Sequence, residues 1–137
     1  LEMIAVNKFR GLHTLVLFDL DPTGQGTGDQ RPMKPNDAKR SMDLMRSTLD
    51  ERLKQFTTPP ESTLIAVQEA TFKAFLLEDM DELPVVLCSD MGTQDQKIIF
   101  TNIGGLEKLE GGRLNCLLIP AWTSEVEGKA LLRWKLE

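Results

Sequence analysis

The order of apolar and polar positions along the chain predicts strands alternating with helices. Residues 12–20 form a continuous apolar run, which is typical of a strand covered on both faces. Residues 21–34 are rich in Gly, Asp and Pro and predict a loop. From Pro35 onwards apolar residues recur at steps of three and four to about residue 56, which predicts an amphipathic helix.

A second helix is expected from about residue 60 to residue 78. The segment Thr58-Pro59-Pro60-Glu61 fits a capping box, with Thr58 as N-cap and the Glu61 side chain reaching back to it. The helix is apolar over much of its circumference. We therefore expect it to be either deeply buried or part of an interface.

The rest of the chain predicts three more strands and two more helices. The strands are expected at residues 84–89, 96–101 and 114–119, with a short helix between glycines at 104–112. A last helix should cover residues 123–135, with Thr123 or Ser124 as its cap. The order β-α-α-β-β-α-β-α predicts an α/β fold, a mixed sheet with helices packed on it, as one domain over residues 1–137.

Composition narrows the possible partners. The chain has 137 residues, of which 41% are apolar, enough for one domain with a core. The net charge of −5 and the scattered basic residues argue against a nucleic-acid partner. The apolar runs are too short to span a membrane. Cys88 and Cys116 each lie in an apolar run, which predicts buried reduced thiols and a cytoplasmic location, with a disulfide between neighbouring strands as the alternative.

Candidate chemistry is sparse. His13, the single histidine, precedes the first strand; it is either an acid–base residue or, as we favour, a hydrogen-bonded structural residue. Asp19 and Asp21 point the same way on a strand, but no third metal ligand accompanies them. The glycines at 24, 26 and 28 do not open a helix directly, so we read them as a connector rather than a phosphate cradle. No catalytic residue and no metal ligand is assigned.

Four segments carry a resemblance to one known family. The segment "GLHTLVLFDLD" (11–21) holds a Gly-Leu-His-Thr-Leu run followed by apolar residues and Asp. It resembles the stretch that opens the C-terminal subdomain of the diphthine synthase family. "RPMKPNDA" (31–38) resembles the family's Pro-Met-x-Pro-x-x-Ala helix start, and "MGTQDQKI" (91–98) its Gly-x-x-Asp-Gln segment. "LLIP" (117–120) followed by "VEGKAL" (126–131) resembles the closing strand and helix.

The resemblance implies the C-terminal α/β subdomain of a tetrapyrrole methylase-like methyltransferase. Such enzymes hold S-adenosylmethionine (SAM) between two subdomains, and the half with the Gly-rich cofactor loop is absent here, so the isolated chain should be inactive. Diphthine synthases methylate the modified histidine of translation elongation factor 2 and are usually homodimers. Two alternatives remain, namely another methyltransferase of this fold and a non-catalytic dimerisation or binding domain.

The resemblance also implies three cofactor-binding positions, which are Phe18, Met91 and Asn115. In the family such positions offer backbone groups and an apolar wall to the adenine. The methyl group of a sulfonium is already activated, so alignment rather than a catalytic side chain is required. Three positions depart from the family pattern, because Asp90 replaces an Arg, and Asn115 and Ser124 each replace a His. The charge reversal at Asp90 is not neutral beside a cofactor.

Overall fold

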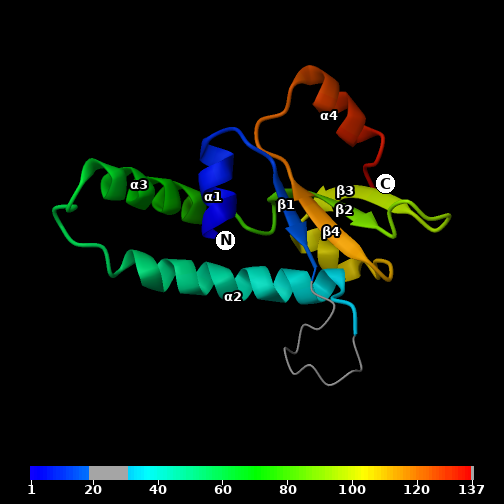
Figure 1. Cartoon of the computed structure of the whole chain (residues 1–137), viewed down its shortest axis with the longest axis horizontal. Helices are drawn as coiled ribbons and strands as arrows, with labels where there is room; N and C mark the ends of the chain where they lie inside the picture. Colours follow the sequence, from blue (N-terminus) through cyan, green and yellow to red (C-terminus); the bar gives the residue numbers. More distant parts are fainter. Residues whose placement is uncertain (19–30, 137) are drawn as a thin grey trace.

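The computed structural model describes residues 1–18 and 31–136, and it confirms the expected succession of elements with one addition (Figure 1). The addition is an N-terminal helix. In chain order the elements are α1 (Glu2–Phe9), β1 (Thr14–Leu17), α2 (Pro35–Leu53), α3 (Thr63–Leu77), β2 (Pro84–Ser89), β3 (Lys97–Asn102), the 3-10 helix η1 (Gly104–Lys108), β4 (Asn115–Ile119) and α4 (Glu125–Leu132). Asp19, Asp21 and residues 24–28 lie outside the described residues.

The four strands form one sheet in the order β1-β4-β2-β3, and each pair of neighbours is antiparallel. The α/β class is confirmed. Among the described residues, the parallel component expected of a mixed sheet is limited to an isolated bridge between Phe100 and Lys135. Because β1 and β2 are both antiparallel to β4, their carboxyl ends meet the amino end of β4 at the same end of the sheet.

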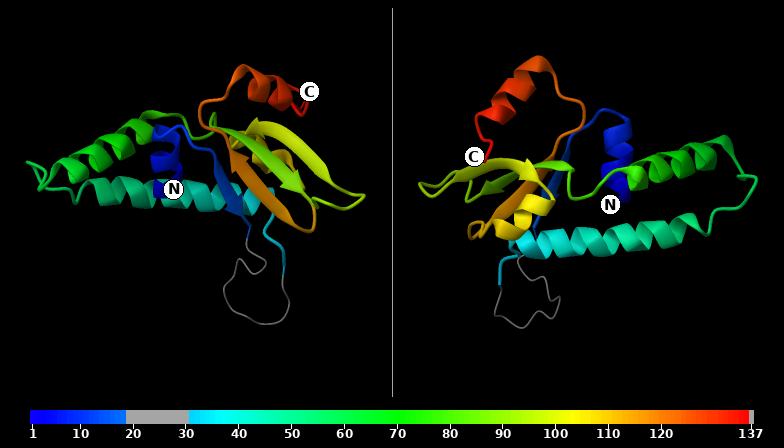
Figure 2. Two further views of the ribbon diagram at one scale, coloured as in Figure 1. Left: turned by 45° about the horizontal axis from the view of Figure 1, so that its top comes forward. Right: turned by 180° about the vertical axis from the view of Figure 1, so that it is seen from behind.

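One face of the sheet supplies the core. Side chains alternate between the two faces of a strand, so Val16, Leu87 and Leu117, which are cross-strand partners, share the inner face. This face lies over α2 and η1 (Figures 1 and 2). Full burial of each large apolar side chain contributes about 1.5–3 kcal/mol. The largest fully buried apolar side chains are Phe72, Leu49, Leu87, Ile103, Leu106, Leu117, Ile119 and Val85.

The outer face of the sheet is apolar and is uncovered along β1, whereas Val86 of β2 is only 4% exposed. Leu15 is 60% exposed and Leu17 is 76% exposed, while Thr14 and Val16, which alternate with them, face inward. The expectation that the first strand is covered on both faces is therefore wrong for β1. The apolar run in the sequence is continuous because the outward-facing positions of β1, which are exposed in this chain, are also occupied by leucine. Helix α4 lies above this face in Figure 1 but buries none of its own residues.

Helices α1 and α3 pack together beside the sheet. Ion pairs between Lys8 and Glu78 and between Arg52 and Glu2 tie α1 to the end of α3 and to α2. The sequence gives α1 little amphipathic pattern, and only Ile4 and Ala5 are buried in it. This weak pattern explains why the helix was not expected.

Helix α3 begins later, and is more exposed, than the sequence indicated. Its N-cap is Ser62, whose hydroxyl accepts a hydrogen bond from the Ile65 amide at 3.3 Å, so the predicted capping box of Thr58 and Glu61 is wrong. The buried residues of α3 are limited to Thr71, Phe72 and Phe75. Several of its other apolar side chains face solvent, which excludes deep burial in this chain and leaves the interface alternative.

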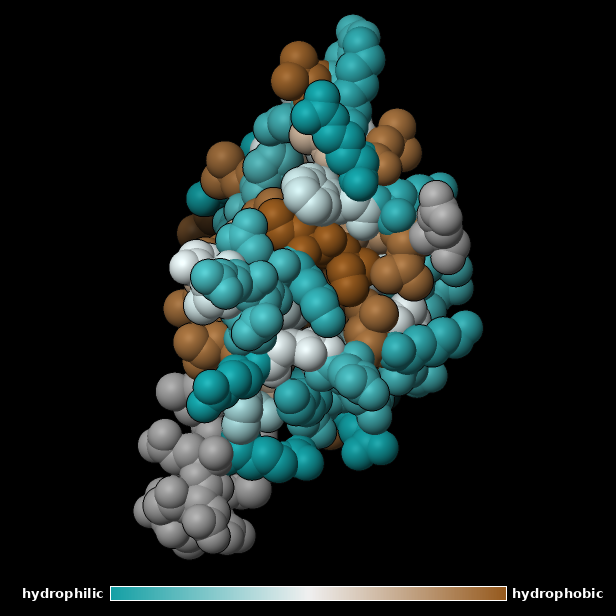
Figure 3. Space-filling model, turned by 90° about the vertical axis from the view of Figure 1, so that its right-hand side faces the viewer, coloured by the Kyte–Doolittle hydropathy of each residue, from teal (hydrophilic) through white to brown (hydrophobic). Residues whose placement is uncertain are grey.

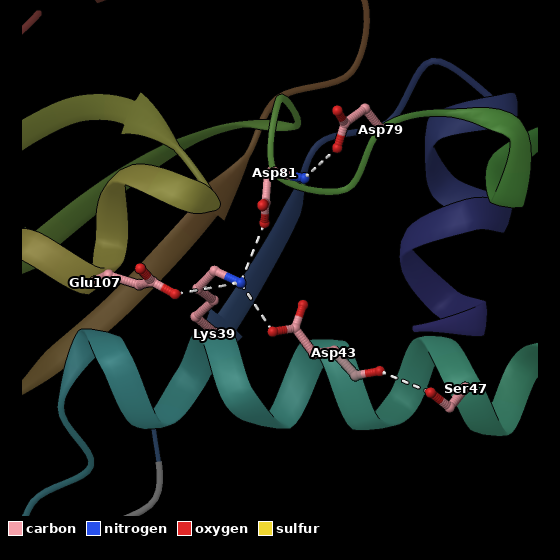
Figure 4. A network of polar contacts seen from close by, with 6 residues as sticks. All are labelled: Lys39, Asp43, Ser47, Asp79, Asp81 and Glu107. Carbon is pink, nitrogen blue, oxygen red and sulfur yellow. Dashed lines mark hydrogen bonds and ion pairs between the residues drawn. The ribbon is translucent and has the colours of Figure 1, made fainter.

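A cluster of charged side chains holds the first part of α2 to the turn before β2 and to η1 (Figure 4). The Lys39 ammonium, with a side chain only 10% exposed, lies 2.8 Å from Asp43, 3.1 Å from Asp81 and 3.6 Å from Glu107. These carboxylates come from α2, from the turn before β2 and from η1. The hydrogen bond with Asp43 is the largest cause that raises the pKa of Lys39, so the amine stays charged.

Candidate functional site

An apolar groove opens at the end of the sheet where β1, β2 and β4 meet. Its volume is about 360 Å³. Phe18 follows β1, Met91 follows β2 and Asn115 opens β4, so the structure brings the three predicted cofactor positions to one place. We call it the outer-face groove and define it by its lining residues, which are Leu17, Phe18, Cys88, Met91, Leu114, Asn115 and Cys116.

Apolar side chains also gather on the side of the molecule that carries the β2–β3 hairpin. Figure 3 shows this side, with a hydrophobic area at its centre below α4 and hydrophilic residues around it. Cross-strand register places Leu17, Cys116, Cys88 and Ile98 in one row across the outer face of the sheet. The groove is therefore one end of a broader apolar surface.

Asp90 shapes the rim of the groove next to Met91. Its backbone has a φ of 50°, a left-handed conformation that Asp tolerates better than most residues. Its carboxylate Oδ1 accepts hydrogen bonds from the amides of Arg113 and Leu114, both at 2.8 Å. The Asp90 carbonyl accepts the Thr93 amide at 3.1 Å. The Asp90 carboxylate thus holds the turn before β4 to the turn after β2.

The side chain of Asn115 is committed to the fold. Its Oδ1 accepts hydrogen bonds from Ser89 Oγ at 2.8 Å and from the Gly112 amide at 2.7 Å. Its Nδ2 donates to the carbonyls of Met33 at 3.2 Å and Gly112 at 3.1 Å. The residue is 8% exposed. With its amide fully occupied, Asn115 can offer a ligand only contact along the groove wall, not side-chain hydrogen bonds.

Gly111 and Gly112 make this arrangement possible. Gly111 has a φ of 67°, and a Cβ there would lie 2.7 Å from Asn115 Oδ1 and 2.8 Å from Cδ of Pro35. A Cβ on Gly112 would collide with the Asp90 carboxylate. The pair of glycines therefore lets two polar side chains approach the backbone closely.

A more polar hollow of about 550 Å³ adjoins the groove and shares Met91 and Leu114 with it. Its remaining lining residues are Pro32, Asp90, Thr93, Asp95 and Arg113. Asp95 belongs to the Gly-x-x-Asp-Gln segment singled out in the sequence. The two spaces together offer an apolar wall beside charged groups, which suits a ligand with one apolar and one charged end.

His13 does not line the groove. Its Nδ1 accepts the Ala121 amide at 3.0 Å, and its Nε2 lies 3.3 Å from a carboxylate oxygen of Glu127 in α4. These contacts support the structural interpretation of His13. Ser124 caps the same helix, and its hydroxyl accepts the Glu127 amide at 3.3 Å, so the cap expected at Thr123 or Ser124 is Ser124.

The lining side chains of the groove include no carboxylate, imidazole or amine. Its reactive groups are the thiols of Cys88 and Cys116, which are free and half-buried rather than buried as expected. Burial, followed by the neighbouring Cys116 thiol, raises the pKa of Cys88. Among the helices of the described segments, none is long and apolar enough to cross a membrane.

Solved structures share this fold. The crystal structure of a "putative diphthine synthase" from Entamoeba histolytica matches with a TM-score of 0.62 and 21% sequence identity over 98% of this chain. A conserved hypothetical protein from Aeropyrum pernix K1 matches with a TM-score of 0.62 and 21% identity over 96% of this chain. No family model matches the sequence, and no curated protein does. The predicted likeness to diphthine synthase is confirmed at the level of the fold.

The chain spans 43% of the first neighbour and 37% of the second. More than half of each neighbour therefore has no counterpart in these residues. A surface that is exposed in this chain can correspond to one that is covered in a longer protein.

Four groove residues were not expected from the sequence, namely Leu17, Cys88, Leu114 and Cys116. Leu17, Leu114 and Cys116 are sequence neighbours of expected positions, and Cys88 is the cross-strand partner of Cys116. The missing information is strand register, which sets which residues of β1, β2 and β4 face one another. Antiparallel pairing in the observed register places the two cysteines opposite each other.

Proposed function

We propose that residues 1–137 are the second half of a SAM-dependent methyltransferase and that the outer-face groove is one wall of its cofactor cleft. The observation that carries the proposal is the convergence of Phe18, Met91 and Asn115 on one groove. These positions come from three separate segments of the sequence. The fold shared with a structure described as a diphthine synthase supports the same assignment.

In this proposal the groove receives the adenosine part of SAM. Met91 and Leu114 supply apolar contact, and Phe18, whose side chain packs against the core, contributes its backbone. The adjoining hollow places Asp95 and Arg113 near the charged end of the cofactor. SAM supplies an activated methyl group. The chain's own residues bind and orient the cofactor, and they exclude water from one side of it.

The methyl acceptor that we propose is the modified histidine of translation elongation factor 2, as in diphthine synthases. The working protein would be a cytoplasmic homodimer. Another methyltransferase of the same fold would use the same groove with a different acceptor, since a fold does not determine a substrate. The chain alone, with one wall of the cleft, should not transfer methyl groups.

A non-catalytic dimerisation domain is the second candidate, and one observation favours it. Helix α3 exposes apolar side chains, with Leu64 at 78% and Leu77 at 88%. Sedimentation equilibrium of the chain and of a Leu64→Glu variant tests this candidate. A dimer that the substitution disrupts supports it, and a monomeric wild-type chain contradicts it.

Calorimetric titration with SAM tests the cofactor site, first on this chain and then on the protein completed with the upstream half of the same gene. The completed protein should bind SAM, and Met91→Asp should weaken binding by about tenfold or more, since it places a carboxylate in an apolar wall. Met3→Asp is the matched control, because Met3 is exposed on α1 and does not line the groove.

The outcomes separate the candidates. A completed protein that does not bind SAM contradicts both methyltransferase assignments. Binding that Met91→Asp and Met3→Asp leave equally intact contradicts the assignment of the groove. Transfer of labelled methyl groups to elongation factor 2 supports the diphthine synthase assignment, and binding without such transfer favours another acceptor.

A further inference from the structure

Cys88 and Cys116 face each other across two strands at the floor of the outer-face groove. They are direct register partners in the β2–β4 ladder. Both thiols are free, and both residues are half-buried, so a small reagent entering the groove can reach them. The two residues are far apart in the sequence, and the antiparallel register of β2 and β4 brings them together.

The ladder also fixes what kind of pair they are. The Asp90 amide donates to the Leu114 carbonyl at 2.8 Å, which makes that pair a hydrogen-bonded one. Hydrogen-bonded and non-hydrogen-bonded pairs alternate along an antiparallel ladder. Cys88 and Cys116 lie two residues further along, so they too form a hydrogen-bonded pair.

This pair type has a consequence for disulfide geometry. The Cα atoms of a hydrogen-bonded pair are about 5.5 Å apart, within the range that a disulfide spans. Their Cβ atoms are roughly 5 Å apart, whereas a relaxed disulfide needs roughly 3.5–4.5 Å. The bond can therefore close, but the two strands must be drawn together, and the strain makes the bond easy to reduce.

We propose that Cys88 and Cys116 form a reversible dithiol–disulfide site whose oxidant is a low-molecular-weight disulfide of the glutathione class. Burial and the neighbouring Cys116 thiol raise the pKa of Cys88, which disfavours it as the first nucleophile. We therefore assign the first attack to Cys116. Cys88 then acts as the resolving thiol, held opposite by the ladder.

The reaction balances in two steps. The Cys116 thiol loses its proton to solvent and attacks one sulfur of the reagent disulfide, whose S–S bond breaks and releases one reagent thiolate. The Cys88 thiol then loses its proton and attacks the Cys116 sulfur of the mixed disulfide, which releases the second reagent thiolate. The two protein thiols together lose two electrons, and the reagent disulfide gains them and becomes two thiols.

Graded mixtures of oxidised and reduced glutathione, followed by alkylation with N-ethylmaleimide and mass spectrometry, test the proposal on the native chain. As the oxidised fraction rises, the wild-type chain should lose two hydrogens and its capacity for two maleimides together. Proteolysis should then yield one peptide pair that links Cys88 to Cys116. Excess reduced glutathione should restore both thiols without denaturant.

Single-thiol variants distinguish resolution from inaccessibility. Cys88→Ser should accumulate a stable glutathione adduct on Cys116, because the resolving thiol is gone. Cys88→Ala serves the same purpose if serine disturbs the strand, and circular dichroism checks that each variant is folded. Three results overturn the proposal: a persistent adduct on the wild-type chain, a disulfide between two chains, or a bond that reduced glutathione opens only after unfolding.

The dithiol–disulfide site does not depend on the cofactor assignment. It uses the register of β2 and β4 and the accessibility of two thiols, and neither depends on what the groove binds. A chain that forms the disulfide but, when completed, does not bind SAM would retain this site and lose the proposed function. The reverse result would retain the function and remove the site.

Discussion

Asn115 is the residue through which the turn before β4, the end of β2 and the segment before α2 are joined. Replacing it with alanine removes four hydrogen bonds at a buried position and leaves Ser89 Oγ and the Gly112 amide without their partner. We expect Asn115→Ala to lower the free energy of unfolding by about 2–4 kcal/mol, since buried unpaired groups add to the lost bonds. Urea unfolding followed by circular dichroism measures the change.

Asn102 provides the control for this prediction. Its Oδ1 accepts one hydrogen bond, from the Gly105 amide at 2.8 Å, and the residue is half-buried. Asn102→Ala should therefore cost only about 1 kcal/mol. Equal losses for the two variants would show that the Asn115 network contributes no more than a single bond.

For Asn115 the sequence predicted the place in the groove but not the hydrogen bonds of the side chain. Phe18, Met91 and Asn115 were singled out from segment order and motif likeness, and the structure brings all three to one groove. That the Asn115 amide is fully occupied could not be predicted. Its partners Met33, Ser89 and Gly112 lie far apart in sequence and meet only through the register of the sheet and the start of α2.

At the scale of elements, α4 depends on a cap that titrates. The Glu127 carboxylate accepts the Ser124 amide at 2.7 Å and contacts His13. These hydrogen bonds, first those to Ser124 and then that to His13, lower the pKa of Glu127 from its ordinary value of 4.5. Because the folded pKa is lowered, this contribution to stability is complete above pH 4.5 and disappears as the pH falls through the folded pKa.

We therefore expect the amides of the first turn of α4 to lose hydrogen-exchange protection in acid before the core amides do. Glu127→Gln should remove most of this pH dependence, because the amide cannot titrate. Glu125→Gln is the matched control, since Glu125 lies in the same turn and pairs with Lys129 on the exposed surface. A loss of protection with identical pH dependence in all three proteins would refute the role of Glu127.

Lys39 joins α2 to the turn before β2 and to η1. Lys39→Met keeps the apolar stem of the side chain and removes the charge, leaving three carboxylates without their common cation. The carboxylates are about half exposed and stay hydrated, so we expect a loss of about 2 kcal/mol, between the values for exposed and buried pairs. Chemical denaturation at neutral pH measures it.

The pH dependence of this cluster has the opposite sign to that of α4. The pKa of Lys39 is raised, so its contribution is complete below the ordinary value of 10.5 and disappears only as the pH rises through the folded pKa. Lys54→Met is the control, because Lys54 pairs with Asp50 and Glu51 on the surface of the same helix. A larger effect at Lys54 than at Lys39 would contradict this account.

Elements with strong local signals were predictable and those without were not. The strand at 84–89 was predicted with its bounds as observed, since it is an apolar run between polar turns. The start of α3 was misplaced because Thr58-Pro59-Pro60-Glu61 matches a capping-box pattern in the sequence. In the structure Ser62 is the N-cap of the helix. The choice between these two candidate N-cap residues depends on backbone geometry that the local sequence does not determine.

At the scale of the molecule, the two faces of the sheet have the same chemistry and different surroundings. The inner face is closed by α2 and η1, and the outer face is apolar and open along β1. The sequence shows the apolar runs but not which side of each strand is covered within this chain. The unequal coverage is consistent with a chain that spans less than half of its structural neighbours.

The substitutions Leu117→Ala and Leu17→Ala make this difference measurable. Leu117 is fully buried on the inner face of β4, and Leu17 is 76% exposed on the outer face of the adjacent β1. In this chain Leu117→Ala should cost about 2–5 kcal/mol through lost burial and a cavity. Leu17→Ala should change stability by less than about 0.5 kcal/mol. Urea unfolding of both variants provides the comparison.

The upstream half of the proposed enzyme should change the effect of Leu17→Ala on stability but not the effect of Leu117→Ala. If that half covers the outer face, Leu17→Ala becomes a buried truncation in the completed protein and should cost about 1–2 kcal/mol there, whereas the effect of Leu117→Ala stays as it was. A Leu17→Ala effect that remains negligible in the completed protein would mean that β1 is exposed there too. The open face would then serve a partner other than the missing half.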